Sequence, residues 1–227
     1  QRQGADAAMN VDEALKTRVS IRAFKPEPLP ESLVREIIDV ARFAPSGGNL
    51  QPWRVIAVAG AERDAVVALA QANLPGDDAP YPVYPENLWE PYRSRRFKVG
   101  EDMYALLGIP RENKPARLMH LAQNFQFFGA PVGLFFVTDT RMGHGQWAHL
   151  GMLMQSIALA ALERGVQSCM QEAWARMRGP LHGHFGLGET EVIYCGMALG
   201  YADMSNPVNT LRSDRAEVDE IAVFKGF

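Results

Sequence analysis

The sequence predicts a single domain of the α/β or α+β class, with helices covering both faces of a central sheet. At 227 residues, the chain has the length of one ordinary to large domain and can bury a substantial core. Hydrophobic residues make up 47% of it and charged residues 22%, a balance typical of soluble globular proteins. Segments of helical periodicity intermingle with short apolar runs that resemble strands, which favours three layers: helix, sheet and helix.

A short helix and an extended connector are expected first. Asn10 and Glu13 have the spacing of a capping box, which predicts a helix over Val11 to Lys16. Residues 17–30 mix β-branched and charged residues and end in three prolines, so they should be extended. Further helices are predicted over residues 31–44, 62–72, 92–107, 111–128 and 146–164. Strands are predicted over residues 55–58, 132–139, 166–170 and 192–199, with the run DEIAVF (219–224) as a candidate edge strand.

Two segments stand out from this pattern. The helix over 146–164 is apolar almost all round from Leu150 to Leu162, so it must be covered on every side, as the central helix or in a subunit interface. Residues 73–91 instead contain five prolines and three aromatic residues. A long irregular segment inside a compact domain is usually functional, so this one is expected to form a lid or binding loop.

The totals exclude several classes of protein. The formal charge of −3 gives no global reason to expect a nucleic-acid or membrane partner, and the most apolar run is too short to span a bilayer. Cys169 and Cys195 lie in apolar, strand-like runs without a CxxC motif, so buried reduced thiols are expected. The N-terminus does not have the layout of a signal peptide. We expect a cytoplasmic protein whose residues 1–9 are a disordered, processed or expression-derived end.

Two polar clusters have alternative interpretations. The stretch YRSRRFK (92–98) is compatible with a solvated helix face, a weak nucleic-acid patch, or a cationic mouth for an anionic small molecule such as a carboxylated aromatic. His182 and His184 are close in sequence, but no third ligand is placed nearby. A polar loop is therefore favoured over a metal site.

The segment Arg18-Val-Ser20-Ile-Arg22 suits an anion. In an extended chain, residues two apart share a face, so two guanidinium groups and a hydroxyl point the same way. Three exposed polar residues on an edge strand are an equally good explanation of this segment by itself.

Two later loops also carry groups that bind ligands. In PSGGN (45–49), the glycines permit close backbone approach, and Ser46 and Asn49 supply hydroxyl and amide contacts. A helix end followed by a turn explains the same residues equally well. In LRSDR (211–215), Arg212 and Arg215 suit bidentate phosphate contacts, although a solvated connector is the commoner case.

Taken in order, these segments resemble the nitroreductase family of FMN-dependent flavoproteins. The residues that carry the resemblance are RVSIRAF, APSGGNLQPW, FFGAPVGLFFVTD, GVQSCMQEAWA and LRSDRAEVDE, collinear over roughly residues 11 to 224. The stretch from Tyr84 to Ile109 is most similar to the nitroaromatic or nitrobenzoate reductase branch. The resemblance implies an α+β fold, a mixed sheet sandwiched by helices, over residues 10–227. It also implies an intertwined homodimer with an extended C-terminal tail and two FMN sites at the subunit interface.

The resemblance places twelve residues around the cofactor. They are Arg18, Ser20, Arg22, Pro45, Ser46, Asn49, Gln51, Asn124, Glu172, Ala173, Arg212 and Arg215. By this resemblance, Arg18 and Ser20 hold the phosphate and ribityl end, and Arg215 holds the phosphate with Arg212 in support. Arg22 should lie nearer flavin N1 and the C2 carbonyl.

Part of this site should come from the partner subunit. The resemblance assigns Pro45, Ser46 and Asn49 to the flavin of the other chain, with Gln51 supporting the loop. The branch often has a carboxylate near His149, and the histidine here would alter a helix cap or the local charge.

The remaining contacts concern the flavin ring. Glu172 and Ala173 should present backbone N–H groups to N5 and O4, and Asn124 is a further ring contact. A guanidinium near N1 would raise the reduction potential, and no catalytic side chain is implied because the chemistry belongs to the cofactor. NADH or NADPH would reduce the flavin, and an electron-poor acceptor such as a nitroaromatic would reoxidise it in ping-pong order. Specificity should then lie in a lid over residues 73–107.

Other functions remain open on the sequence. The same fold could serve flavin fragmentation, dehalogenation or biosynthetic ring oxidation. A flavin-binding protein without turnover and a nucleic-acid binder acting through residues 92–98 are the alternatives from other classes.

Overall fold

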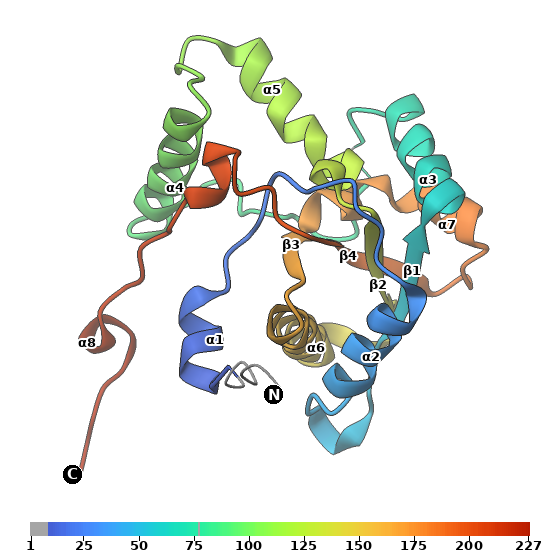
Figure 1. Ribbon diagram of the computed structural model, residues 1–227. Helices are drawn as coiled ribbons and strands as arrows, with labels where there is room; N and C mark the ends of the chain where they lie inside the picture. Colours follow the sequence, from blue (N-terminus) through green and yellow to red (C-terminus); the bar gives the residue numbers. More distant parts are fainter. Residues whose placement is uncertain (1–8, 77) are drawn as a thin grey trace, which may run out of the picture.

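A four-stranded sheet forms the centre of the molecule (Figure 1). The computed structural model describes residues 9–76 and 78–227; residues 1–8, most of the expected disordered end, lie outside them. The strands are β1 (Arg54–Ala59), β2 (Val132–Asp139), β3 (Gln167–Gln171) and β4 (Glu191–Gly200), in the order β1-β2-β4-β3. The three ladders are antiparallel, and an isolated parallel bridge joins Ser20 to Ser168 at the outer edge of β3.

Eight α-helices and five 3₁₀ helices occur in the described residues. The α-helices are α1 (Val11–Thr17), α2 (Glu31–Ala41), α3 (Gly60–Ala72), α4 (Tyr92–Leu106), α5 (Lys114–Ala122), α6 (Gly143–Glu163), α7 (Arg178–Phe185) and α8 (Val218–Ile221). The 3₁₀ helices are η1 (Gly47–Asn49), η2 (Gln123–Gly129), η3 (Thr140–Met142), η4 (Glu172–Met177) and η5 (Pro207–Thr210). Residues 73–91 form neither helix nor strand where they are described, as predicted.

Three predicted elements differ in the structure. The helix predicted over 31–44 ends at Ala41. The helix predicted over 111–128 begins at Lys114 and gives way to η2, where Phe127 and Phe128 have φ values of 53° and 52°. The candidate edge strand 219–224 is wrong, because a capping box between Glu217 and Glu220 starts α8 there instead.

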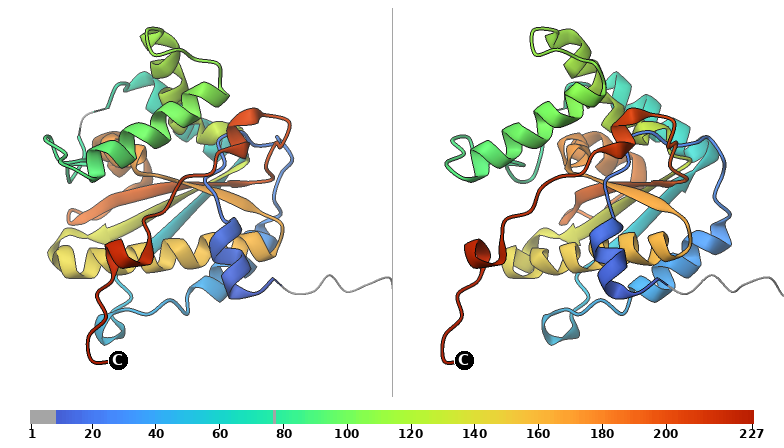
Figure 2. Two further views of the ribbon diagram at one scale, coloured as in Figure 1. Left: turned by 90° about the vertical axis from the view of Figure 1, so that its left-hand side faces the viewer. Right: turned by 60° about the vertical axis from the view of Figure 1, so that its left-hand side comes forward.

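The sheet separates two hydrophobic cores, which confirms the predicted three layers. Alternate residues of β2 face opposite sides: Leu134 and Phe136 pack in one core, and Phe135 and Val137 pack in the other. The first core is completed by α2 and α6, and the second by α3, α7, η2 and η4. Figure 2 shows α6 running beneath the sheet, with α4 and α5 on the far side. Each fully buried large side chain contributes about 1.5–3 kcal/mol.

Trp174 is the centre of the second core. Its ring is fully buried, stacks on Phe127 at a centroid distance of 4.7 Å, and meets Phe125 and Phe135 edge-on at 5.3 and 5.1 Å. The sheet has no side chain at Gly196, where a Cβ would lie 2.4 Å from Trp174 Cδ1. This gap in β4 lets η4 lie close against the sheet.

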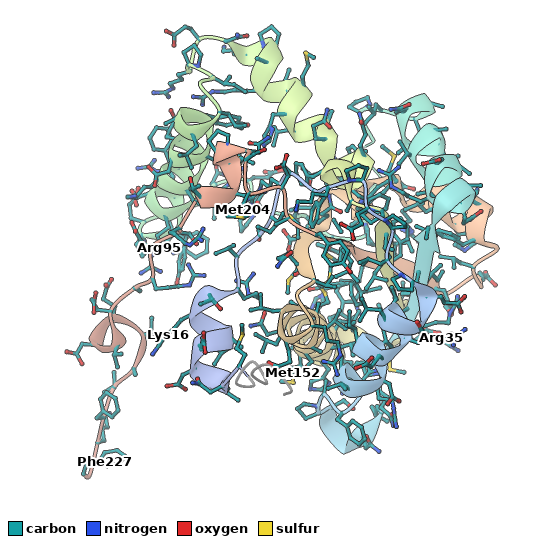
Figure 3. All side chains as sticks on the ribbon, in the orientation of Figure 1. Lys16, Arg35, Arg95, Met152, Met204 and Phe227 are labelled. Carbon is teal, nitrogen blue, oxygen red and sulfur yellow. The ribbon has the colours of Figure 1, made fainter. Side chains whose placement is uncertain are left out.

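The helix α6 is covered by the sheet, α2 and α1, but one of its faces is left exposed. Leu150, Leu153 and Ile157 are fully buried, whereas the Met152 side chain is 43% exposed and stands on the other face (Figure 3). The prediction that this helix is covered on every side is therefore not met within one chain.

The N-terminal connector and the C-terminal tail run together along the β3 edge. The buried Asn209 side chain accepts the Arg22 N–H at 2.8 Å and donates to the carbonyls of Ala23 and Asp203, each at 2.8 Å. The tail then passes α4, where Figure 3 places Arg95 beside it, and ends at an exposed Phe227. No helix in the described part of the chain is long and apolar enough to cross a membrane.

We expect Gly196→Ala to destabilise the protein by about 1–3 kcal/mol, because the added methyl group has no room beside Trp174. Urea unfolding measures the change. Gly183→Ala in α7 is the matched control, since a Cβ there meets nothing within 4 Å, and it should be neutral or stabilising by up to about 1 kcal/mol. Equal unfolding midpoints for the two variants would contradict this account of the core.

Candidate functional site

A cavity of about 920 Å³ lies between the β3–η4 segment and a cover made of α4, α5 and the irregular loop. Its volume is in the range of small-molecule sites. Four of the twelve predicted cofactor residues line it: Arg22, Asn124, Glu172 and Ala173. The chain thus brings residues that are 150 positions apart in sequence to one cavity.

The cavity floor is fixed by hydrogen bonds behind it. The Gln171 amide donates to the Asn124 carbonyl at 2.8 Å and accepts the indole N–H of Trp174 at 3.3 Å. Gln171 is almost fully buried, so a conformational change at the floor would leave buried polar groups unpaired. The Trp174 core therefore sets the positions of Asn124 on one side and of η4 on the other.

Two guanidinium groups lie together beside this cavity. Burial lowers the pKa of Arg18, and the positive charge of Arg215 lowers it further. Arg18 Nε is buried and has no hydrogen-bond partner among the described residues. Within the described residues, Arg215 donates only to its own turn: to Ser213 O at 3.0 Å, Ser213 Oγ at 2.7 Å and Asp214 O at 2.9 Å. Two close cations with an unused buried donor are a suitable site for a phosphate-like anion.

The neighbouring predicted residues lie around this pair. Arg212 donates to the carbonyls of Asn209 at 3.1 Å and Leu211 at 2.9 Å, which ties the tail to its own backbone. Ser20 forms the parallel bridge with Ser168, next to Cys169. The two segments that carry Arg18 and Arg215 are distant in sequence and adjacent in the fold.

Both cysteines are buried free thiols, as predicted. Burial raises the pKa of the Cys169 thiol, and it raises that of Cys195 to about 12. Neither sulfur is a reactive thiolate near neutral pH.

The predicted loop residues lie elsewhere. Pro45, Ser46, Asn49 and Gln51 do not line the cavity of their own chain; the loop follows α2 on the α6 side of the sheet (Figure 1). Ser46 Oγ accepts the Gln51 N–H at 2.9 Å, and Asn49 and Gln51 both have positive φ, of 53° and 49°. The loop therefore has a defined, partly strained shape with exposed side chains.

His149 holds this loop against α6. Its Nδ1 lies 3.5 Å from the Gly47 N–H and 3.0 Å from Gln146 Oε1. A Cβ at Gly47 would lie 3.1 Å from His149 Cε1, so only glycine allows this close approach without a shift. The histidine therefore makes a packing contact at the point where the loop meets the helix.

The irregular segment, residues 73–91, contributes several residues to the wall of the cavity. Leu74, Pro75, Val83 and Tyr84 line it. The segment is attached to the body by the Tyr81 hydroxyl, which donates to the Tyr194 carbonyl, and its aromatic ring also meets Trp147 edge-on at 5.7 Å. Its path over the cavity is thus anchored rather than free.

Sequence reasoning missed His120. This histidine lines the cavity between the rings of Tyr104 and Phe128, and its Nε2 is buried without a described partner. Burial lowers the pKa of His120, and the charge of Arg22 lowers it further. The available signal was its spacing: His120 precedes Asn124 by one helical turn, so the two could share a face.

Glu172 is the acidic residue among those that line this cavity, beside the three arginines Arg22, Arg96 and Arg176. Desolvation raises the pKa of its carboxyl group. Its side chain is accessible from the cavity, which weakens that desolvation but does not remove it. The cavity therefore has an excess of positive charge.

The two histidines considered for a metal have separate partners. His182 Nε2 lies 2.9 Å from the Gly188 carbonyl, and His184 Nε2 lies 2.7 Å from Glu62 Oε1. Among residues 9–76 and 78–227, no group of three or more metal-ligating side chains is found.

Known proteins with the same fold and similar sequence place these features in context. The Nitroreductase family model matches residues 15–201. The chain is 38% identical to the 4-nitrobenzoate reductase of Pseudomonas putida, over 95% of this chain and 96% of the relative. It is 33% identical to the nitrobenzene nitroreductase of Ectopseudomonas oleovorans, over 94% and 96%.

Solved structures agree with these relatives. The FMN- and NADPH-dependent nitroreductase NfnB from a Sphingopyxis strain superposes with a TM-score of 0.91 and 41% identity, covering 96% of this chain and 100% of that one. The FMN-dependent NfnB from Mycobacterium smegmatis, in complex with NADPH, superposes with a TM-score of 0.87 and 30% identity, covering 95% and 97%. The α+β fold of the described residues is that of these enzymes.

The lowered pKa of His120 predicts acid sensitivity. A histidine whose pKa is lower in the folded state binds fewer protons there than in the unfolded chain. Its contribution to stability is therefore lost as pH falls below about 6.5, the usual histidine value, towards the folded pKa. We expect the loss of unfolding free energy between pH 7.5 and 5.5 to be smaller in His120→Gln than in the wild type.

Urea unfolding at the two pH values tests this, with His144→Gln, an exposed histidine on α6, as the control. The control should keep the wild-type pH dependence. The same acid loss in His120→Gln as in the wild type would show that the pKa of this histidine is not lowered on folding.

Proposed function

The chain belongs to the nitroreductase family, and on that basis we propose that it is an FMN-dependent NAD(P)H oxidoreductase that reduces nitroaromatic compounds. The observation that carries this proposal is the pair of guanidinium groups of Arg18 and Arg215, with an unused buried donor, beside a cavity of ligand size. The names of the full-length relatives, nitrobenzoate and nitrobenzene reductases, support the acceptor class.

The described residues fit FMN at both of its ends. Arg18, Ser20 and Arg215 would hold the phosphate and ribityl end, with Arg212 holding the tail in place. The orphaned Arg18 Nε is the donor that this anion would satisfy. The cofactor's negative charge would also relieve the repulsion between the two arginines.

Residues lining the cavity would hold the ring. Arg22 would lie near flavin N1 and the C2 carbonyl, and Asn124 would contact the ring. Glu172 and Ala173 begin η4, so their N–H groups have no partner earlier in that helix and would face N5 and O4. Asn209 fixes the backbone of Arg22, and the Arg22 guanidinium lies 3.4 Å from the Ser20 carbonyl through Nη1.

When bound, FMN supplies the redox centre that accepts a hydride from the nicotinamide and delivers it to the acceptor. The chain's own residues then have three tasks. Arg22 stabilises negative charge at the ring, η4 orients it, and the cover over residues 73–107 excludes water and selects the acceptor. The nicotinamide and the acceptor use the same cavity of about 920 Å³ in turn, which gives ping-pong kinetics.

The active form is proposed to be a homodimer in the cytoplasm. Three features of the single chain support an obligate partner. The loop with Pro45, Ser46, Asn49 and Gln51 lies outside its own cavity, and Met152 on α6 is exposed. The tail ends with further exposed apolar side chains, including Phe227. The loop would then form one wall of the partner's flavin site.

Anaerobic half-reactions test the function. The purified, FMN-loaded protein should be bleached by NADH or NADPH and recolour when a nitroaromatic is added. Bleaching without recolouring by any acceptor would indicate a flavin protein with another task. A colourless protein that cannot be reconstituted with FMN would refute the proposal.

Arg215→Ala should weaken FMN binding roughly 10- to 100-fold, because a hydrogen bond to a charged group is worth about 1.5–3 kcal/mol. Fluorescence titration of the apoprotein with FMN measures this. Arg35→Ala is the control, since Arg35 pairs with Glu31 on exposed α2 at 2.7 Å. If only the affinity for the nicotinamide falls, the assignment of Arg215 to the phosphate is wrong.

Ser46→Trp should lower FMN occupancy without unfolding the protein, because the bulky side chain would intrude on the partner's flavin. FMN content per chain and the circular dichroism spectrum measure the two effects. Leu50→Trp, in the same loop at an exposed position without a predicted contact, should keep the wild-type occupancy. Full occupancy in Ser46→Trp would count against the assignment of this loop to the flavin site.

A further inference from the structure

Basic side chains gather at the start of α4, and most of them are neutralised. Arg93 Nε lies 2.9 Å from Glu90 Oε1, and Arg95 Nη2 lies 3.4 Å from Glu220 Oε2. Lys98 Nζ contacts carboxylate oxygens of Asp102 at 2.6 Å and of Asp214 at 3.1 Å. These three charges therefore belong to ion pairs with the helix itself, the preceding turn or the tail.

Arg96 is different from its three neighbours. Its guanidinium carbon lies 4.0 Å from the centroid of the Tyr84 ring, and no carboxylate lies within 4 Å of it in the described part of the chain. A cation over an aromatic face leaves the in-plane N–H groups available for oxygen acceptors. The stack thus orders Arg96 without using its hydrogen-bonding capacity.

Arg96 and Tyr84 stand where two cavities meet. Both residues line the site cavity of about 920 Å³ and a second cavity of about 800 Å³ that runs along α4. Leu74, Val83 and Leu118 are among the apolar residues that line the site cavity. An aromatic ring would lie against these side chains, and a polar substituent at its end would meet Arg96.

The other arginines of the site cavity lie on different elements. Arg22 is assigned to the flavin, and its Nη1 lies 3.4 Å from the Ser20 carbonyl. Arg176 belongs to η4 at the floor, and it also lines a smaller cavity of about 450 Å³ together with residues 79–83. Arg96 is the cation carried by the cover, which is where acceptor selection is expected.

We propose that Arg96, stacked on Tyr84, is the specificity-determining residue that binds the carboxylate of an aromatic nitro acid. This inference rests on the proposed function and names the acceptor class. A planar guanidinium matches a carboxylate through two parallel N–H···O bonds, which orients the acceptor as well as holding it. The nitro group at the opposite end of the ring would then extend towards η4.

The test compares a carboxylated acceptor with a neutral one of the same ring size. The FMN-loaded enzyme and its Arg96→Met variant are assayed with 4-nitrobenzoate and with nitrobenzene. Replacing a charged hydrogen bond should lower the ratio of the two kcat/KM values, nitrobenzoate over nitrobenzene, by roughly 10- to 100-fold. Arg96→Lys should lower the ratio less, because lysine keeps the positive charge and loses only the paired N–H donors of the guanidinium.

Arg95→Met is the matched control. Arg95 is adjacent in sequence on the same helix, but it pairs with Glu220 and lines neither cavity. This variant should keep the wild-type ratio. A ratio that is unchanged in Arg96→Met, or that falls equally in Arg95→Met, would overturn the proposal.

A second readout does not depend on turnover. Benzoate carries the carboxylate but no nitro group, so it binds without being reduced. Its binding to the oxidised holoenzyme can be followed by calorimetry. Its affinity should fall by the same factor in Arg96→Met. Unchanged benzoate affinity together with slower reduction of the bound FMN by NADPH, but not by NADH, would show that Arg96 binds the 2′-phosphate of NADPH, and would refute the proposal.

The same data separate this inference from the proposed function. A wild-type enzyme that reduces nitrobenzene without preferring 4-nitrobenzoate would refute the role of Arg96 and leave the nitroreductase activity standing. A wild-type holoenzyme that reduces neither acceptor would refute the proposed activity, and benzoate binding would then decide whether Arg96 still binds a carboxylate.

Discussion

The packing of Trp174 into a gap in the sheet is the constraint on which the site depends. Because β4 has a glycine at position 196, the indole can lie against the strand and stack on Phe127. The indole N–H then fixes Gln171, and Gln171 fixes Asn124. One aromatic side chain thus aligns η4 with η2, and these two elements form the floor of the cavity. A rigid floor of this kind is what a cofactor needs to be held with its reactive atom in place.

Above this floor, the charges of the chain are divided between paired and unpaired groups. Most surface arginines have carboxylate partners, and such exposed pairs contribute little to stability. Near the cavity the pattern changes, because Arg215 is close enough to lower the pKa of Arg18 and Arg96 lies over an aromatic ring. Cations that are left without carboxylates cost free energy in the folded chain. In the proposed function both sites bind an anionic ligand, which connects the electrostatics of the fold with that function.

The sequence predicts the secondary structure better than it predicts the site. β2 occupies the predicted residues 132–139, since its apolar run is long and uniform. The break at Phe127 could not be predicted, because its positive φ depends on room that Gly133 leaves in a neighbouring strand. Family resemblance identified Arg22 and Glu172, which line one cavity. His120 has no local motif, and its place becomes evident only when α5 and β3 are brought together. The basic stretch 92–98 indicated an anion site, but only the fold separates Arg96 from its ion-paired neighbours.

In the proposed site, one FMN molecule joins the Arg18–Arg215 pair to the floor formed by η4, with a wall from a second chain. A crystal structure of the FMN-loaded protein is the decisive measurement. We expect a phosphate between Arg18 and Arg215, the flavin ring against Glu172 and Ala173, and Ser46 of the partner subunit beside the ring. A flavin bound elsewhere, or a complete site built from a single chain, would contradict it.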